Sequence, residues 1–494
     1  MLVIVSDFHF SDGTAVPANW NVNPRGIELL LRDVYRQAAR KGVRELYLVL
    51  LGDMFDTLRS EVWLQVPLGE RPWGDPQALH DGYELPAATR RHARGITESI
   101  ISQNRAALDL LAGRPPTPTL DYEPDPDLAP PAGLPVHRVF IPGNHDRLYL
   151  CDSQVRRLTR EALGSIDETS AAAAAQGIFP HHLLMPRYGL LARHGHEYDP
   201  WNFERHHGGH APPLLASELT AGDYLQVPIG DPITTELVVG FTRKIRQFLH
   251  EADKFRPEQI ARIIERIQRI EDVRPTMAAF RWVFYETERL TQSDGAAAEQ
   301  LELTEPQQLL LRDIMGTALR ELSVAFGEMP FYQAWRDLHN HLGCDLPEQI
   351  DLALLALRHT GPRTVARVLG IWDSLAALMR PVDVIAQGAA RESDLPCQYP
   401  GGMRFVVYGH THEPLAYALP RRRKHGGDLR FADLYLNSGT WRDRVFAAAD
   451  GLDFARWRSA TYIVLYSEDE NQPSGDLRRV GPAFDSWTGH RAND

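Results

Sequence analysis

The chain has 494 residues, of which 43% are hydrophobic, 24% charged and 9% aromatic, a globular composition without a repeat long enough for a solenoid. This length exceeds a single compact core, so it predicts two or three domains or one domain with large insertions. The formal net charge of −12 gives no general attraction to nucleic acid or to an anionic membrane, although a local basic patch could still act.

The three cysteines match neither a thiolate metal site nor a disulfide framework, because Cys151, Cys344 and Cys397 are far apart. A reducing compartment is the simplest interpretation. No basic segment precedes the first apolar run, and no stretch approaches the roughly 18 to 20 apolar residues of a membrane span. We therefore expect a cytoplasmic protein without a membrane span.

Five short apolar runs predict buried strands, because each is brief, rich in aliphatic residues and bounded by Gly, Asp or Asn. They are Leu2–Val5, Leu46–Leu51, Val136–Ile141, Leu190–Ala192 and Phe405–Tyr408. A helix over residues 25–40 would supply the crossover between the first two. The pattern indicates an α/β fold.

Two long intervals interrupt this pattern. Residues 57–135 contain a predicted helix over residues 87–112 and a proline-rich surface loop over residues 115–135, where proline excludes regular helix. Residues 205–400 are predicted to be a mostly α-helical insertion that could cap the site. Its helical patterns are the isoleucines at positions 260, 263, 264, 267 and 270, followed by residues 278–290, 307–325 and 365–378.

The C-terminal part, residues 401–494, predicts further strands. Residues 415–419 and 434–436 form a hairpin whose basic tip, residues 421–424, could contact a polyanionic substrate or simply be solvated. A strand over residues 460–466 and a polar tail from residue 467 follow. The core is thus expected in two parts, residues 1–204 and 401–494, with residues 205–400 inserted between them.

A polar cluster follows each of the five predicted strands, where ligands of an open sheet gather. The clusters are Asp7-Phe8-His9, Gly52-Asp53, Gly143-Asn144-His145-Asp146, His194-Gly195-His196 and Gly409-His410-Thr411-His412. Oxygen and imidazole ligands without cysteine suit hydrolytic divalent metals. The last cluster is the strongest, since two histidines one residue apart can address two neighbouring ions. The competing interpretation is that such histidines only make hydrogen bonds at strand ends.

In this order the clusters resemble the calcineurin-like metallophosphoesterase superfamily, whose pattern is Asp-x-His, Gly-Asp, Gly-Asn-His-Asp/Glu, His and Gly-His-x-His. The resemblance covers about residues 1–56, 136–204 and 401–466. It implies a four-layer α/β/β/α sandwich of mixed sheets and two divalent ions, which could be Mn²⁺, Fe²⁺/Fe³⁺ or Zn²⁺. One metal would be bound by Asp7, His9 and His412, the other by Asn144, His194 and His410, and Asp53 would bridge them.

The resemblance also implies roles beyond metal binding. His145 would contact the substrate phosphate or assist the leaving group, and Asp56 would orient His145. His196 could exchange with His194 as the ligand or, like Asn144, contact the substrate. The residues after the fourth cluster could support the ligands, bind substrate or only pack as a loop; these are Glu197, Tyr198, Asp199, Trp201 and Asn202.

The sequence therefore predicts a phosphoesterase that hydrolyses a phosphomonoester, phosphodiester or pyrophosphate by attack of a water bridging two metals. The alternative is a DNA or RNA nuclease, which would need an open and positively charged groove. A nucleotide-sugar pyrophosphatase similar to those of lipid A synthesis is less favoured, because such enzymes commonly have arginine where His145 stands. A non-catalytic scaffold is also less favoured, because the ligand set is intact. The oligomeric state is open.

Overall fold

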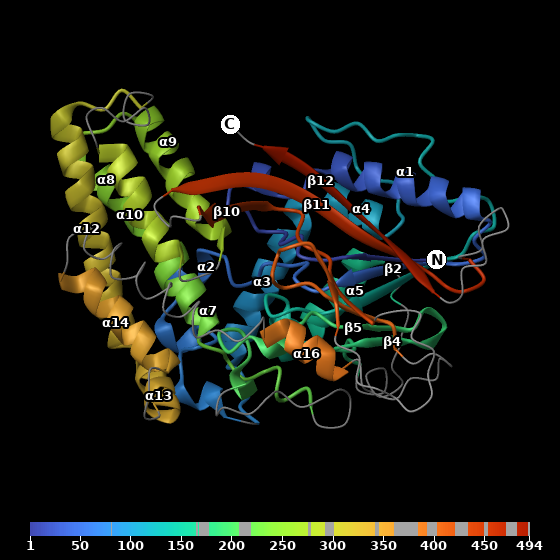
Figure 1. The fold of residues 1–494 in the computed structure, drawn as a ribbon. Coiled ribbons are helices and arrows are strands. Elements are labelled where there is room, and N and C mark those ends of the chain that lie inside the picture. Colours follow the sequence, from blue (N-terminus) through green and yellow to red (C-terminus); the bar gives the residue numbers. More distant parts are fainter. Residues whose placement is uncertain are drawn as a thin grey trace.

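The computed structural model describes residues 1–80, 82–164, 166, 177–206, 219–274, 278–291, 301–340, 345–359, 384–392, 403–419, 433–448, 453–470 and 482–492. Two mixed β-sheets and a large set of helices make up these parts of the chain (Figure 1). The predicted α/β class is confirmed.

The first sheet contains the N-terminal strands. β1 (Leu2–Val5), β2 (Leu46–Leu51) and β3 (Val136–Ile141) are parallel neighbours, and β1 also pairs antiparallel with β11 (Phe454–Tyr466). β11 pairs antiparallel with β10 (Asp443–Ala447) and β12 (Ala483–Ala492), and β10 pairs parallel with β6 (Val273–Arg274). The sheet is therefore mixed.

The second sheet has the order β4-β5-β7-β9-β8. β5 (Leu190–Ala192), β7 (Phe405–Tyr408) and β9 (Leu434–Asn437) are parallel, while β4 (Leu183–Met185) and β8 (Leu415–Ala418) are antiparallel edges. The predicted pairing of β8 with β9 is confirmed. The basic tip at residues 421–424 lies outside the described residues.

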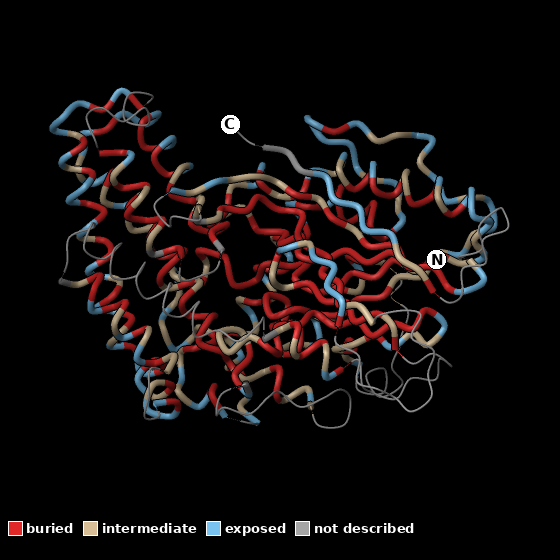
Figure 2. The backbone as a smooth tube through the Cα atoms, in the orientation of Figure 1, coloured by how far each residue is buried: buried red, intermediate tan, exposed pale blue. Residues whose placement is uncertain are grey.

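The five predicted strands have the predicted bounds, and the two sheets share a buried core (Figure 2). Side chains of β1 alternate between two clusters, as the period of a strand requires. Leu2 and Ile4 pack with Leu190 of β5 and Val407 of β7, whereas Val3 packs with the helices on the other side. β1 is thus buried on both faces, which explains its continuous apolar run.

Helix α1 (Pro24–Lys41) connects β1 to β2 where the sequence predicted a crossover. The side chain of Asn23 accepts a hydrogen bond from the amide of Arg25 at the N-terminus, and Pro24 stands at the first helical position. Gly42 ends the helix with a φ of 59°. This left-handed conformation is easily adopted by glycine, so α1 stops there.

The single helix predicted over residues 87–112 is wrong, because two helices occupy this interval: α3 (Ala87–Gln103) and α4 (Arg105–Leu111). Asn104 separates them with a φ of −113°, and its amide nitrogen donates to the carbonyls of Ser11 and Ile100. At this break, Asn104 holds the loop after β1 through its contact with Ser11. Residues 115–135 contain no helix or strand, as predicted, and α5 (Ser153–Leu163) follows β3.

The described parts of residues 205–400 are mostly helical, as predicted, and those from α8 to α14 stack at the end of the molecule opposite the N-terminus, whereas α16 packs against the second sheet (Figure 1). The helices are α7 (Gly230–Pro232), the π-helical η8 (Ile233–Val239), α8 (Gly240–Ala252), α9 (Pro257–Ile267), η9 (Gln268–Asp272), α10 (Ala278–Thr291), α12 (Glu305–Gly327), α13 (Pro330–His339), α14 (Leu346–His359) and α16 (Val384–Glu392). The five isoleucines are buried in the core of this segment. The helix predicted over residues 365–378 lies outside the described residues.

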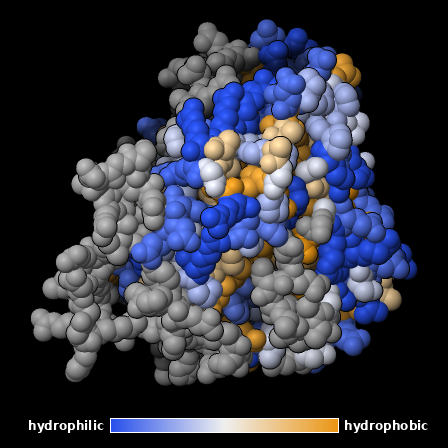
Figure 3. Space-filling model, turned by 90° about the vertical axis from the view of Figure 1, so that its right-hand side faces the viewer, coloured by the Kyte–Doolittle hydropathy of each residue, from blue (hydrophilic) through white to orange (hydrophobic). Residues whose placement is uncertain are grey.

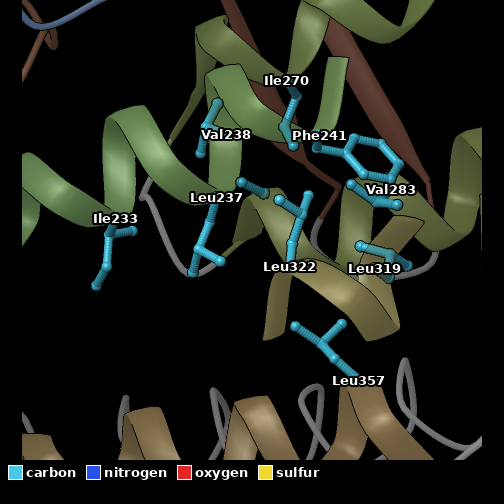
Figure 4. A pocket seen from close by; sticks show the side chains of 10 residues that line it. Ile233, Leu237, Val238, Phe241, Ile270, Val283, Leu319, Leu322 and Leu357 are labelled. Carbon is cyan, nitrogen blue, oxygen red and sulfur yellow. The ribbon is translucent and has the colours of Figure 1, made fainter. Parts of the chain in front are cut away.

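A pocket within the helical segment has an entirely apolar lining (Figure 4). It is bounded by Ile233, Leu237, Val238, Phe241, Ile270, Ala279, Val283, Leu319, Leu322 and Leu357. None of these side chains can bind a metal or a phosphate. The polar chemistry of the chain must therefore lie elsewhere.

The polar tail predicted for the C-terminal part is wrong, and one strand there is longer than predicted. The strand predicted over residues 460–466 is confirmed as the second half of β11, whose start at Phe454 was missed, and the predicted polar tail contains β12, which pairs with β11 over ten positions. β12 lies on an exposed edge, so residues from Asp485 to Gly489 are open to solvent and show no apolar alternation. Phe484 packs against Phe405, with 5.7 Å between ring centroids.

The described helices include none that is long and apolar enough to cross a membrane. Figure 3 views the molecule from the side of the N-terminus. Hydrophilic residues dominate the described surface there, and apolar residues show mainly near the centre of the view.

Candidate metal centre

The five polar clusters meet where strands of both sheets end. β1 and β2 lead into Asp7 and Asp53, whereas β5 and β7 lead into His194 and His410. Three groups of side chains have metal-binding atoms within 4.8 Å of one another: Asp7, His9, Asp53 and His412; Asp53, His194 and His410; and His9, Asp56 and His145. Asp53 belongs to the first two groups. These Asp and His groups, almost all buried, could hold a metal ion.

Three glycines of the clusters allow the convergence, because a side chain at each would collide with a candidate ligand. A Cβ at Gly52 would lie 2.1 Å from Nδ1 of His194, and one at Gly143 would lie 2.1 Å from Oδ1 of Asp53. A Cβ at Gly409 would lie 2.6 Å from Oδ2 of Asp7. The clusters therefore need glycine for close packing.

The candidate ligands also carry unusual backbone conformations. Among the described residues, seven non-glycine residues have a positive φ, and five of them are candidate ligands. These are Asp7 (55°), His9 (47°), Asp53 (51°), His410 (68°) and His412 (60°). Such conformations cost energy in L-residues and concentrate at functional sites. The backbone is thus held in an unfavourable state that brings these side chains together.

Three of the histidines each hold one ring nitrogen against a protein partner, and the other ring nitrogen of His9 lies 2.9 Å from Nε2 of His412. Nδ1 of His9 lies 3.1 Å from Oδ2 of Asp56, and Nδ1 of His194 lies 2.9 Å from the carbonyl oxygen of Leu51. Nε2 of His410 lies 2.8 Å from Oδ2 of Asp199. Partners of this kind fix the tautomer and the orientation of metal-binding imidazoles.

Buried atoms without a hydrogen-bond partner fit a cation here. They are Oδ1 of Asp7, Oδ1 of Asn144 and Nε2 of His194. Nε2 of His412 lies 3.2 Å from Oδ1 of Asp7, and Nε2 of His194 lies 3.2 Å from Oδ2 of Asp53. A bound metal would satisfy the unpartnered Oδ1 of Asn144 and would take the place of these long contacts of Asp7 and His194.

The charges of the groups compensate one another. Burial alone would raise the pKa of Asp7 and of Asp53, but the neighbouring histidines outweigh it and hold both well below the ordinary range. Burial would lower the pKa of His194, but the carboxylates of Asp53 and Asp7 raise it to about 10. His194 is therefore protonated in the metal-free protein, and a metal must displace that proton.

Asp56 and His145 form a buried pair beside the ligands. Oδ1 of Asp56 lies 2.7 Å from Nδ1 of His145, and Arg59 lies 3.5 Å from Oδ2 of Asp56. Burial would lower the pKa of His145, but Asp56 and Asp53 outweigh it and raise that pKa. Arg59 in turn lies 3.1 Å from Glu271 of the helical segment.

Sequence reasoning missed Arg59 and Glu271. No motif marks Glu271, which lies more than 200 positions away from Arg59 along the chain. Its only signal was a charge beside the isoleucine pattern of the helical segment, which is also what a solvated helix face shows. Glu271 is nevertheless buried and joins the helical segment to the site.

The loop after the fourth cluster contributes two side chains. Besides Asp199, which holds His410, Asn202 accepts a hydrogen bond of 3.2 Å from the amide nitrogen of Asn144. Glu197 instead forms an ion pair of 2.8 Å with Arg193. Of this loop, Asp199 and Asn202 contact candidate ligands, and they are therefore the residues that orient His410 and Asn144.

His194, and not His196, lies in the group with Asp53. The ring of His196 is buried 5.4 Å from that of His194, and burial lowers its pKa to about 3, so it is neutral. His196 therefore borders the centre without joining the Asp53 group.

No family model, curated protein or solved structure matches this chain.

Proposed function

We propose that the chain is a dinuclear metal-dependent phosphoesterase, as its resemblance to the calcineurin-like metallophosphoesterases implies. One observation carries the proposal: Asp53 belongs both to the group with Asp7, His9 and His412 and to the group with His194 and His410. A shared carboxylate can keep two cations close despite their repulsion. The buried oxygen of Asn144, which has no hydrogen-bond partner, would complete the second set.

The proposal includes the four-layer α/β/β/α arrangement that the resemblance implies. Three buried clusters support it. One lies between the two sheets, one joins the first sheet to α1, α3, α4 and α5, and one joins the second sheet to Ala386 and Ala389 of α16. Each sheet would then have helices on its outer face.

Two divalent metals would supply a bridging water of lowered pKa and neutralise the phosphate oxygens. One ion would be held by Asp7, His9 and His412, the other by Asn144, His194 and His410, with Asp53 between them. Mn²⁺, iron and Zn²⁺ all accept such oxygen and imidazole ligands. The orientation of three candidate ligands, His9, His194 and His410, is fixed by protein partners. Asp56, the carbonyl of Leu51 and Asp199 each contact one ring nitrogen of these histidines.

His145 is the proposed acid of the reaction. Its Nδ1 is held by Asp56 at 2.7 Å, which leaves Nε2 to face the substrate. As the bond from phosphorus to the leaving oxygen breaks, Nε2 donates a proton to that oxygen. Asp56 keeps the ring in the required orientation and favours its protonated form.

Activity of the metal-loaded full chain tests the proposal. The panel comprises a model phosphomonoester, a model phosphodiester, pyrophosphate, nucleotides, and single- and double-stranded nucleic acid. We expect Asp53→Asn to lose metal and activity together, and His145→Ala to keep metal but lose about 10²- to 10⁴-fold in kcat. His92→Ala is the matched control, because His92 pairs with Glu70 at 2.8 Å away from the site.

A wild-type protein that binds two metals but hydrolyses none of these compounds would show the proposal to be wrong. Full activity of Asp53→Asn would contradict it as well. Hydrolysis of nucleic acid alone would identify the chain as a nuclease.

A further inference from the structure

Arg444 of β10 is a buried arginine that forms no ion pair with a described carboxylate. The residue is 5% exposed, and its Nε is buried without a hydrogen-bond acceptor. No described residue forms an ion pair with it, and its Cζ lies 4.1 Å from the centre of the Phe446 ring. Because arginine is rarely buried unless it is paired, this state needs an explanation.

The position of Arg444 relates it to the metal centre. Just before β10, the hydroxyl of Thr440 donates to the carbonyl oxygen of Asp7 at 2.8 Å, and the amide of Trp441 donates to the same oxygen at 3.3 Å. The acidic groups that act on Arg444 are Glu413, which directly follows His412, and Asp7. Arg444 therefore lies on a strand that follows directly after the residues in contact with Asp7, and the carboxylates of Glu413 and Asp7 are close enough to act on its charge.

The other buried arginines near the site have carboxylates beside them. Arg59 lies 3.1 Å from Glu271, Arg193 lies 2.6 Å from Glu392, and Arg442 lies 2.9 Å from Asp272. Burial lowers the pKa of Arg444 to about 10 against the opposing charges of Glu413 and Asp7, so it is still charged at neutral pH. Arg444 is thus a buried cation beside the centre that lacks an anion of its own.

We propose that Arg444 binds a phosphate group of the substrate beside the metal held by Asp7, His9 and His412. The inference rests on the proposed function, because it places the phosphate at that metal. A guanidinium offers two parallel N–H groups that match two phosphate oxygens. Cations bound to Asp7 would remove part of the negative charge that now acts on Arg444, which strengthens its attraction to an incoming anion.

Calorimetric titration of the metal-loaded full chain with inorganic phosphate and with pyrophosphate tests this role. We expect Arg444→Gln to keep both metals and to weaken binding by at least about tenfold, because a charge-assisted bidentate contact is lost. Arg444→Lys keeps the positive charge but lacks the two parallel N–H groups of the guanidinium. Its affinity for phosphate and pyrophosphate should therefore fall between those of the wild type and Arg444→Gln. Arg458→Gln is the matched control, since Arg458 on the adjacent β11 has its own carboxylate, Asp443, at 2.7 Å.

The two ligands locate the contact. Equal weakening for both places Arg444 at the reacting phosphate, and weakening for pyrophosphate alone places it at a second phosphate group. Melting in anion-free buffer separates a structural role from a binding role. A ligand-binding arginine leaves Arg444→Gln at least as stable as the wild type there, because a buried unpaired charge has been removed.

Unchanged binding of both ligands by Arg444→Gln would overturn the inference, even if the wild type hydrolyses phosphoesters. Loss of binding together with a lower melting temperature in anion-free buffer and loss of metal would also overturn it. Binding that depends on Arg444 in a protein that hydrolyses nothing would instead overturn the proposed function alone.

Discussion

Replacement of Asp56 by Asn should disable the pair that positions His145. Asp56 is fully buried, and its oxygens face three partners: His145 at 2.7 Å, His9 at 3.1 Å and Arg59 at 3.5 Å. Asparagine has one acceptor oxygen and one NH₂ group. The variant can therefore accept from only one imidazole, and it leaves Arg59 with Glu271 as its remaining carboxylate partner at 3.1 Å.

The magnitude follows from this geometry. Removing one partner of a buried ion pair costs about 3 to 5 kcal/mol, and since Glu271 still faces Arg59 we expect the lower end, about 3 kcal/mol. A misoriented His145 should lower kcat by about 10²- to 10⁴-fold. The pKa of His145 should fall, because Asp56 is the largest influence that raises it.

The raised pKa of His145 determines how stability and activity change with pH. The folded pKa of His145 is raised above its ordinary value, so this group stabilises the protein below pH 6.5 and loses that effect as the pH rises through the folded pKa. As the proposed acid, His145 must be protonated, so activity falls on the alkaline side. In Asp56→Asn this alkaline fall should move to lower pH.

The assay combines urea unfolding, metal content and the pH profile of kcat. Asp109→Asn is the control, because Asp109 is a buried carboxylate paired with Arg114 at 2.8 Å outside the site. If Asp56→Asn keeps a kcat within about twofold of the wild type, and its activity falls at the same alkaline pH, Asp56 does not position His145.

Gly143→Ala should lose metal, because its Cβ would meet the backbone and side chain of Asp53, and elemental analysis would detect the loss. Gly316→Ala is the matched control, because its Cβ would meet nothing within 4 Å. It should stabilise its helix by about 0.5 to 1 kcal/mol, which thermal melting would detect. Metal binding at pH 8 should release a proton from His194, whose pKa is raised to about 10, and calorimetry in buffers of different ionisation enthalpy would detect it; no dependence on the buffer would argue against His194 as a ligand. For the metal-free protein, the contribution of His194 to the free energy of unfolding is full below about pH 6.5 and lost towards about pH 10, and this loss should be absent in His194→Gln. Metal removal by a chelator should lower the melting temperature, because the stabilisation by metal binding is lost and the buried Oδ1 of Asn144 then lacks a partner.

The strands and the residues they carry to the site were predictable because their signals are local. The run Leu2–Val5 is apolar throughout because β1 is buried on both faces, and Asp7 follows where the strand ends. The glycines at positions 52, 143 and 409 had a local signal as well, and the structure shows the atoms that they accommodate.

Features that depend on distant partners could not be predicted. Asn104 stands where a helical pattern is interrupted and holds the carbonyl of Ser11, and nothing near it in the sequence indicates that contact. The polar sequence of β12 forms a strand because β11 offers it a partner edge. Arg59 and Arg444 look like ordinary charged residues in the sequence, and only their burial distinguishes them.

Anomalous diffraction from crystals of the Mn²⁺-loaded protein tests the central claim most directly. We expect two peaks roughly 3.5 to 4 Å apart. One should lie against Asp7, His9 and His412 and the other against Asn144, His194 and His410, with the carboxylate of Asp53 contacting both. A single peak, or metal bound away from Asp53, would contradict a dinuclear centre.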